Sequence, residues 1–323
     1  MSFVVMTDTS SNLPSSLISN RDIKEIAFPY FMKGKEYQCT NTDQFDADAF
    51  YAAIKQQGVV VTTSQISPQQ YLDFFEPFLK EGKDILFVCM SSGISGSCNS
   101  AHIGAEEILQ HYPEQRIEII DSLGASLGEG LLALQAADLR DSGTPFEAAV
   151  AELRDAARRM CNVFTVDDLM HLKRGGRLSN LSAAIGTVLN IKPILKGNEE
   201  GKIVAFAKVR GRKQSVKTLA QLYEKMVVEP EKQTVGIAHA ACREDAEILA
   251  SLLREANSPK EILIVDYEPV TGSHVGPGAL ALFFSSYRNI RSYDGESLPT
   301  VMRQAVSKAG EKISMIHKFK NPK

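Results

Sequence analysis

Strand-like and helix-like segments alternate through the first half of the chain, and this alternation restricts the fold more than any other feature of the sequence. Helix signals separate the strands: at Ser67-Pro68, for example, a capping residue precedes a proline, the usual order at the start of a helix. Such alternation predicts an α/β fold with a parallel sheet that is covered by helices on both faces. The predicted strands of this half are Phe3–Met6, Ile26–Met32, Val59–Thr62, Ile85–Cys89 and Ile117–Asp121.

The chain has 323 residues, which is more than one hydrophobic core usually serves, so two domains are expected. We place the first at residues 1–160 and the second at residues 161–323. The second half also contains helices and strands, but Ile191–Lys196 and Lys202–Arg210 flank a Gly-Asn-Glu-Glu-Gly hairpin signal. It is therefore expected to be an α/β domain with a mixed, partly antiparallel sheet.

The second half ends in a basic tail at about residues 287–323. From residue 300 onward it carries six Lys and Arg residues against one Glu, and its apolar residues recur at steps of three and four. This pattern predicts an amphipathic helix. Such a helix docks on its own domain, or it contacts a membrane surface or an acidic partner.

Composition and charge exclude several classes of protein. The formal net charge of −3 argues against nucleic-acid binding. The five Cys and six His residues are scattered without ligand spacing, so we expect no metal and no cofactor. No apolar run approaches the roughly 18 residues of a membrane span, and the N-terminus lacks a signal-peptide pattern, so a cytoplasmic location is expected.

Polar residues gather between the strand Ile85–Cys89 and a helix that is predicted to begin near Ser97. This turn combines the backbone N–H groups of Gly93, Ile94, Gly96 and Ser97 with several serine hydroxyls, among them that of Ser95. Free N–H groups beside a helix N-terminus attract anions, so the turn is predicted to form an anion-binding cup. Cys98 follows directly; either the helix N-terminus activates its thiol, or the residue simply packs.

Cationic and apolar segments elsewhere provide partners for such a cup. Arg177 follows a glycine pair, Arg210 ends a predicted strand, and His274 lies in a predicted glycine-rich loop. Each also has a structural explanation, as a helix cap, a surface charge or a loop histidine. Together with hydroxyl groups they suit a carboxylate or a phosphate, and the almost wholly apolar segment Leu178–Ile194 suits a hydrocarbon tail.

Two further functions remain open from the residues alone. Gly93-Ile94-Ser95-Gly96-Ser97 is close to the Gly-x-Ser-x-Gly elbow of serine hydrolases, although Ser97 replaces the final glycine. A lipid or ester hydrolase would then use Ser95 as nucleophile and His274 as base, with Asp121, which precedes His274 in the chain, as the acid. The third possibility is a regulatory binding module.

Several separated motifs, taken together, resemble the DegV family of fatty-acid-binding proteins over about Phe3 to Ser286. They are Thr7-Asp8-Thr9-Ser10-Ser11-Asn12-Leu13-Pro14, Thr62-Thr63-Ser64-Gln65, Ser92-Gly93-Ile94-Ser95-Gly96-Ser97, Leu172-Lys173-Arg174-Gly175-Gly176-Arg177 and His274-Val275-Gly276-Pro277-Gly278.

The resemblance implies two α/β domains with one long-chain fatty acid bound in a buried tunnel between them. It implies that Thr63 and Ser95 hold the carboxylate, and that Arg177, Arg210 and His274 lie near the headgroup or support its phosphorylation. It further implies a lipid carrier rather than an enzyme, which presents the acid to a separate ATP-dependent kinase that makes an acyl-phosphate. Transient membrane contact for lipid exchange is compatible with such a carrier.

Overall fold

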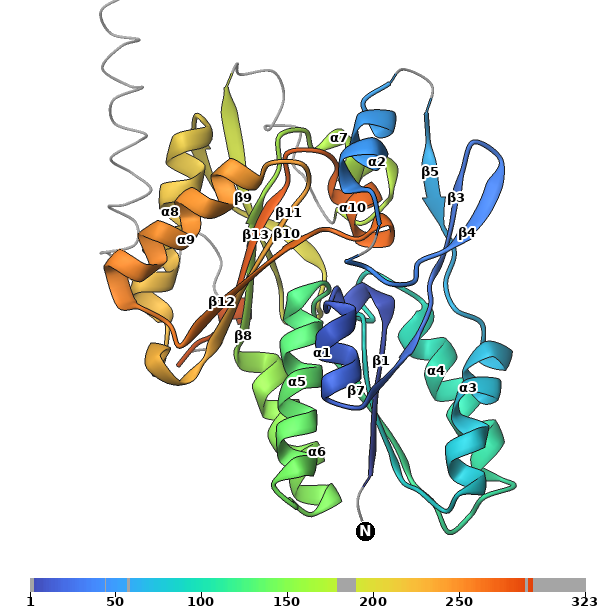
Figure 1. Ribbon diagram of the computed structural model, residues 1–323. Coiled ribbons are helices and arrows are strands. Elements are labelled where there is room, and N and C mark those ends of the chain that lie inside the picture. The colour runs from blue at the N-terminus through green and yellow to red at the C-terminus, as the bar shows by residue number, and fades with distance from the viewer. Residues whose placement is uncertain (1–2, 44, 57–58, 179–189, 288–289, 293–323) are drawn as a thin grey trace, which may run out of the picture.

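The computed structural model describes residues 3–43, 45–56, 59–178, 190–287 and 290–292. Its first half contains a four-stranded parallel sheet in the order β2-β1-β6-β7 (Figure 1). These strands are β1 (Val4–Asp8), β2 (Ile23–Ile26), β6 (Ile85–Cys89) and β7 (Ile117–Asp121).

Helices cover both faces of this sheet. One set of strand side chains, including Val5 and Val88, packs against α5 and α6, whereas the alternate set, including Met6 and Phe87, packs against α3 and α4. The two central strands, β1 and β6, are buried along their whole length. The predicted parallel α/β arrangement is therefore confirmed. The helices of this half are α1 (Ser15–Asn20), α2 (Ala47–Ile54), α3 (Pro68–Lys80), α4 (Ser97–Leu109), α5 (Leu127–Asp141) and α6 (Phe146–Arg159), with a 3-10 turn, η1, at Thr9–Ser11.

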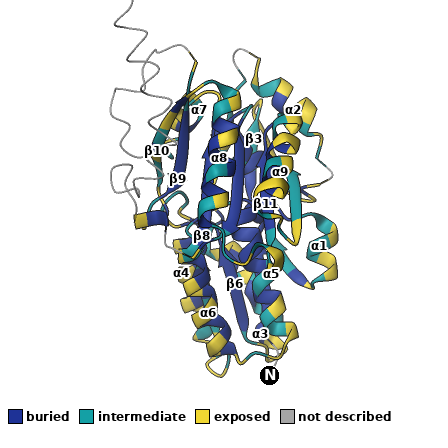
Figure 2. Cartoon of the chain, turned by 90° about the vertical axis from the view of Figure 1, so that its left-hand side faces the viewer, coloured by how far each residue is buried: buried dark blue, intermediate teal, exposed yellow. Residues whose placement is uncertain are grey.

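The second half forms a six-stranded mixed sheet in the order β10-β9-β8-β13-β11-β12, in which the pair β11 and β12 is parallel. The predicted hairpin is present as β9 and β10, and the sheet begins with β8, at Met160. Helices α8 and α9 cover one face of the sheet (Figure 2), and α5 packs against the other. The strands are β8 (Met160–Thr165), β9 (Ile191–Gly197), β10 (Ile203–Arg210), β11 (Thr234–His239), β12 (Glu261–Asp266) and β13 (Leu280–Ser285). The helices are α7 (Met170–Arg174), α8 (Arg212–Met226), α9 (Arg243–Asn257) and α10 (Pro269–Val275), with 3-10 turns η3 (Pro230–Lys232) and η4 (Ile290–Ser292).

Helix α5 joins the two halves, because it contacts β1 and β6 of the first sheet and β8, β11 and β13 of the second. The approach to the second sheet is close: a Cβ atom on Gly128 would lie 2.0 Å from Oδ1 of Asn162. A larger residue at this position would therefore push the helix away from the sheet.

Two predicted strands of the first half do not belong to the parallel sheet. The segment predicted as one strand, Ile26–Met32, is divided between β2 and β3 (Pro29–Met32). Pro29 has no N–H group for a parallel ladder, and the N–H of Phe28 donates to Thr9 Oγ1 instead of to a strand. Strand β3 pairs antiparallel with β4 (Lys35–Gln38) and β5 (Val61–Thr63) in a small third sheet. The expectation that Val59–Thr62 is a strand of the parallel sheet is therefore wrong.

Helix α10 occupies the segment that was predicted to be a glycine-rich loop. The Glu268 carboxylate accepts the N–H groups of Val270 and Thr271, which caps the helix, and Pro269 stands in the first turn. Gly276, with φ of 77°, ends the helix one residue after Val275. His274 therefore lies in the last helical turn, and α10 packs against α7, β3 and β5.

Most of the apolar segment Leu178–Ile194 and the predicted tail helix beyond residue 300 lie outside the described residues. Among the residues that the structure does describe, no helix combines the length and the apolarity needed to cross a membrane.

Candidate functional site

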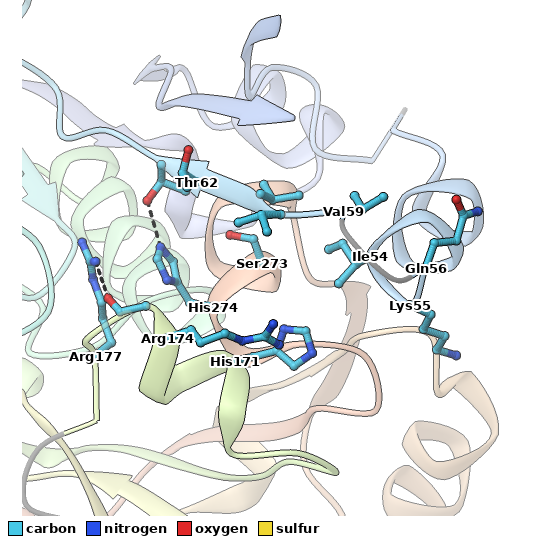
Figure 3. A pocket seen from close by; sticks show the side chains of 14 residues that line it. Ile54, Lys55, Gln56, Val59, Thr62, His171, Arg174, Arg177, Ser273 and His274 are labelled. Carbon is cyan, nitrogen blue, oxygen red and sulfur yellow. Dashed lines mark hydrogen bonds between the residues drawn. The ribbon is translucent and has the colours of Figure 1, made fainter. Parts of the chain in front are cut away.

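Two adjoining cavities lie where α7 and α10 of the second half meet β5 and the loop after β6 of the first. The larger has a volume of about 630 Å³ and the smaller of about 50 Å³. Thr63, Arg177 and His274 line both cavities, so these residues form the partition between them. Figure 3 shows the larger cavity, with Lys55 and Gln56 on one side and Arg177 and His274 on the other.

Thr63 and His274 form the central contact of this partition. Thr63 Oγ1, on the last residue of β5, lies 2.8 Å from His274 Nε2. Burial, together with the nearby charge of Arg177, lowers the pKa of His274 from 6.5 to about 4. The imidazole is therefore neutral at physiological pH and contacts Thr63 as a hydrogen-bonding group without charge.

Ser95 lines the smaller cavity together with Thr63 and His274. Its hydroxyl oxygen accepts the N–H of Ser97 at 3.2 Å and donates to the Ser97 hydroxyl at 3.1 Å. Since the partner of this O–H is another hydroxyl, the proton can be redirected to a ligand without leaving a buried charge unpaired. Thr63 and Ser95 thus bring two neutral donors to the lining of the same cavity.

Arg177 connects the two halves of the molecule at this point. Its Nε donates to the carbonyl oxygen of Ile94 at 3.1 Å, and its Nη1 donates to the carbonyl oxygen of Gly175 at 2.6 Å. The first bond reaches the loop that carries Ser95, and the second binds the end of α7. Arg177 therefore has the capping role that was one of its two explanations, and it also places a positive charge beside His274.

The remaining walls of the smaller cavity are mostly apolar. They come from both halves of the chain and include Phe28, Met90, Ile94, Leu172, Ile203, Val270 and Val275. An apolar cavity with a few convergent polar groups at one end is the usual form of a site for an amphipathic ligand. The described residues therefore supply the polar groups and part of the apolar lining of such a site. Most of the apolar segment Leu178–Ile194, which was predicted to line a hydrocarbon tail, lies outside the described residues.

Three of the four N–H groups of the predicted anion cup have partners within the protein. The N–H of Gly93 donates to the Ser91 hydroxyl, that of Ile94 donates to the Ser91 carbonyl oxygen, and that of Ser97 donates to the Ser95 hydroxyl. A Cβ on Gly96 would lie 2.0 Å from Gln65 Oε1, so the side chain of Gln65 packs against this glycine. The N–H groups of Gly93, Ile94 and Ser97 thus stabilise the loop.

The glycine at position 93 has a separate structural reason. A Cβ atom there would lie 2.3 Å from the carbonyl oxygen of Glu200, at the tip of the β9–β10 hairpin. The hairpin tip therefore covers the loop closely. Cys98, the next residue into α4 after Ser97, is buried, which fits its packing explanation.

The arrangement is not that of a serine hydrolase. The hydrogen bond of His274 Nε2 goes to Thr63, and the hydroxyl of Ser95 bonds to Ser97. The carboxylate of Asp121, the third candidate, accepts the hydroxyl of Ser92 and the N–H of Leu123. Each member of the expected triad is thus engaged with a different partner.

Arg210 is exposed at the end of β10, and it is not among the described residues that line either cavity. Three residues that the sequence analysis did not select line the larger cavity instead, namely Lys55, His171 and Arg174. Arg174 belongs to the Lys-Arg-Gly-Gly-Arg segment, so a signal existed, but sequence alone did not distinguish it from Arg177. Lys55 gave no signal, because a lysine at the end of a surface helix is common.

Both the sequence and the fold of this chain are similar to those of known proteins. A family model described as "Uncharacterised protein, DegV family" matches residues 2–287. The DegV domain-containing protein CPE0026 of Clostridium perfringens is 41% identical over 282 residues, which are 87% of this chain and 97% of the relative.

Two solved structures share the fold over most of their length. The fatty acid binding DegV family protein SAG1342 from Streptococcus agalactiae superposes with a TM-score of 0.79 at 31% identity, covering 89% of this chain and 100% of that one. A DegV family protein from Ruminococcus gnavus, refined with vaccenic acid, gives a TM-score of 0.79 at 26% identity, with 88% and 99% coverage.

Proposed function

The chain belongs to the DegV family, and from this premise we propose that it binds one long-chain fatty acid, with the carboxylate held by Thr63 and Ser95. The observation that carries the proposal is that both hydroxyls and the neutral His274 line the same mostly apolar cavity, with Thr63 in contact with His274. Solved relatives described as fatty acid binding, with the same fold, support the choice of ligand.

The hydrocarbon chain would supply most of the affinity. Burial of roughly 15 methylene groups at ~0.8 kcal/mol each contributes on the order of 12 kcal/mol before the costs of binding. The headgroup would supply orientation and selectivity, since a carboxylate that leaves water must be hydrogen-bonded. Neutral hydroxyl donors meet this need without a buried ion pair.

The proposal sets the tautomer of His274. For the Thr63 hydroxyl to donate its proton to a carboxylate, its oxygen has to accept a hydrogen bond from His274. The imidazole proton then lies on Nε2, 2.8 Å from Thr63 Oγ1. In this arrangement His274 polarises the hydroxyl and aims it at the ligand.

A binding experiment tests the headgroup assignment. Displacement of a fluorescent fatty acid is measured for wild type, Thr63→Val and Ser95→Ala, with Thr40→Val as the matched control because Thr40 is exposed and is not among the residues that line either cavity. Each headgroup variant should bind hexadecanoate about tenfold more weakly, which corresponds to one hydrogen bond to a charged group. If both headgroup variants bind as tightly as Thr40→Val does, the assignment is wrong.

We further propose that the bound acid is phosphorylated by a separate kinase and not by this chain. The sequence contains no glycine-rich nucleotide-binding motif, whereas the larger cavity opens beside Thr63 and His274 and carries the cationic side chains Lys55 and Arg174. Such an opening suits delivery of a phosphoryl group to the carboxylate. Acyl-phosphate formed from ATP and hexadecanoate by the purified chain alone, detected as the hydroxamate, would contradict this division of roles.

Exchange of the ligand with a bilayer is the last part of the proposal. Two large apolar side chains near the rim of the larger cavity are exposed, Val60 at 63% and Met170 at 46%. Cations beside them, Lys55 and Arg174, complement anionic lipid headgroups. Transfer of a fluorescent fatty acid from anionic vesicles should slow in the Val60→Asp variant; an unchanged transfer rate excludes this rim.

A further inference from the structure

No residue of the motif Thr7–Pro14 is among those that line the two cavities described above, whereas Asn12 and Pro14 line a separate third cavity. Its polar residues from Thr7 to Asn12 are nevertheless buried, with exposed fractions of 0 to 2%. Six buried polar side chains in succession carry a large desolvation cost, so their bonds have to be specific.

The bonds of three of these side chains, Asp8, Thr9 and Asn12, lead to elements that build the headgroup site. Asp8 accepts the N–H of Met90 at 3.2 Å, and Met90 lines the smaller cavity at the start of the Ser95 loop. Thr9 Oγ1 accepts the N–H of Phe28 at 3.0 Å, and Phe28 lines the same cavity just before β3. The end of β1 and the turn after it therefore fix two residues that line the smaller cavity and come from the first half of the chain.

Asn12 extends these hydrogen bonds to the second half. Its Nδ2 donates to the carbonyl oxygen of Asp266 at 2.9 Å, and its Oδ1 accepts the N–H of Glu268 at 3.2 Å. The same oxygen accepts the hydroxyl of Ser126 at 3.1 Å, which fixes the orientation of the amide. The Asn12 backbone lies in the left-handed region, with φ of 58° and ψ of 24°, a conformation that Asn tolerates better than most residues.

Glu268 connects the hydrogen bonds of Asn12 to the ligand site. Its carboxylate caps α10, and only six residues further along the same short helix His274 contacts Thr63. A bond that fixes the backbone of Glu268 thereby fixes the helix on which His274 stands. The contact between Thr63 and His274 lies at the opposite end of the helix.

We propose that Asn12 is the positioning residue of the headgroup site: through its bonds to Asp266 and Glu268 it sets the place of α10, and so holds His274 at hydrogen-bond distance from Thr63. The inference rests on the proposed function. It assigns the Asn12 side chain a role in recognition of the carboxylate although the residue does not line the headgroup cavities.

The test separates recognition of the headgroup from binding of the chain. Affinities of hexadecanoate and hexadecanol are measured for wild type and for Asn12→Gly, which keeps the left-handed backbone but removes the side chain. The matched control is Asn41→Gly, because Asn41 is exposed and has a similar φ of 50°. The ratio of the affinity for hexadecanoate to the affinity for hexadecanol should fall about tenfold in Asn12→Gly, as expected when one hydrogen bond is misplaced. Asn41→Gly should keep the wild-type ratio.

The outcomes distinguish the inference from its premise. If wild type binds neither ligand, the proposed function fails. If wild type prefers the acid and Asn12→Gly keeps the same preference, or loses affinity for both ligands equally, the positioning role of Asn12 is wrong.

A second measurement on the wild type keeps the inference testable if Asn12→Gly does not fold. If Asn12 positions His274, linkage requires that a headgroup bound at His274 in turn stabilises the hydrogen bonds of Asn12 to Asp266 and Glu268. Amide hydrogen exchange at Glu268 should therefore slow more with hexadecanoate than with hexadecanol. Equal protection by the two ligands overturns the inference.

Discussion

Replacement of Glu129 by Gln should reduce the dependence of stability on pH, because Glu129 and Asp8 form a buried acid pair. Ser10 Oγ lies 2.5 Å from Asp8 Oδ1 and 2.6 Å from Glu129 Oε2, yet its hydroxyl has one proton to donate. The two carboxyl groups also hydrogen bond to each other. One of them must therefore hold a proton for the cluster to be satisfied.

Burial is the main cause of the pKa shifts of both groups. It raises the pKa of Asp8 from 3.8 to about 6, and burial together with the charge of Asp8 raises the pKa of Glu129 well above its usual range. A raised pKa means that the folded state binds protons more tightly than the unfolded state. The resulting stability is complete below the unfolded pKa, near pH 4, and is lost as the pH rises through about 6.

For Asp8 alone, the loss between pH 4 and pH 8 amounts to roughly 3 kcal/mol of unfolding free energy. In Glu129→Gln a neutral amide donates to Asp8 at every pH, so the raised pKa is no longer required. The variant should therefore be less sensitive to pH than wild type, and above pH 7 it should be the more stable of the two.

Urea unfolding at several pH values between 5 and 8 measures this difference. The comparison with wild type removes the contributions of other buried groups, such as Glu268, whose pKa burial raises to about 7, and His274. Glu106→Gln, an exposed change on α4, serves as the control. Parallel stability curves for wild type and Glu129→Gln across this range would refute the reasoning.

Two further changes probe the loop and the imidazole of the site. Gly93→Ala should destabilise the fold by about 1–3 kcal/mol, because the new Cβ meets the Glu200 carbonyl oxygen; a wild-type urea midpoint would show that the hairpin tip yields freely. NMR titration should find His274 neutral down to about pH 4, and Arg177→Gln should raise its pKa, because the charge of Arg177 is removed. A His274 pKa near 6.5 in wild type would contradict the burial of the ring between Thr63 and Arg177.

The parallel sheet was predictable from the sequence because its strands are fully buried. Ile85–Cys89 is apolar at every position, and no other element type explains so short an apolar run between helix signals. The division at Pro29 was missed, since the length of the apolar run suggested one strand although the proline favoured a break. Helix α10 was missed because the glycines of this segment are typical of a loop. Its cap, the side chain of Glu268, could not be recognised as a cap from the sequence.

The site was predictable as residues but not as geometry. Thr63, Ser95, Arg177 and His274 line one cavity, as the motifs implied, yet Arg210 does not appear beside them. Sequence also does not reveal which N–H groups of the predicted cup find partners inside the loop, as those of Gly93, Ile94 and Ser97 do. The pair Asp8 and Glu129 was invisible for a related reason: their contact depends on how α5 packs across the sheet, and more than a hundred residues separate them.

The most direct test of the account is a crystal structure of the chain with hexadecanoate. The account predicts one ligand between the two halves, its carboxylate within hydrogen-bond distance of Thr63 Oγ1 and Ser95 Oγ and its chain among the apolar walls that include Phe28 and Leu172. A ligand whose carboxylate lies away from both hydroxyls, or whose chain lies outside this cavity, would contradict it.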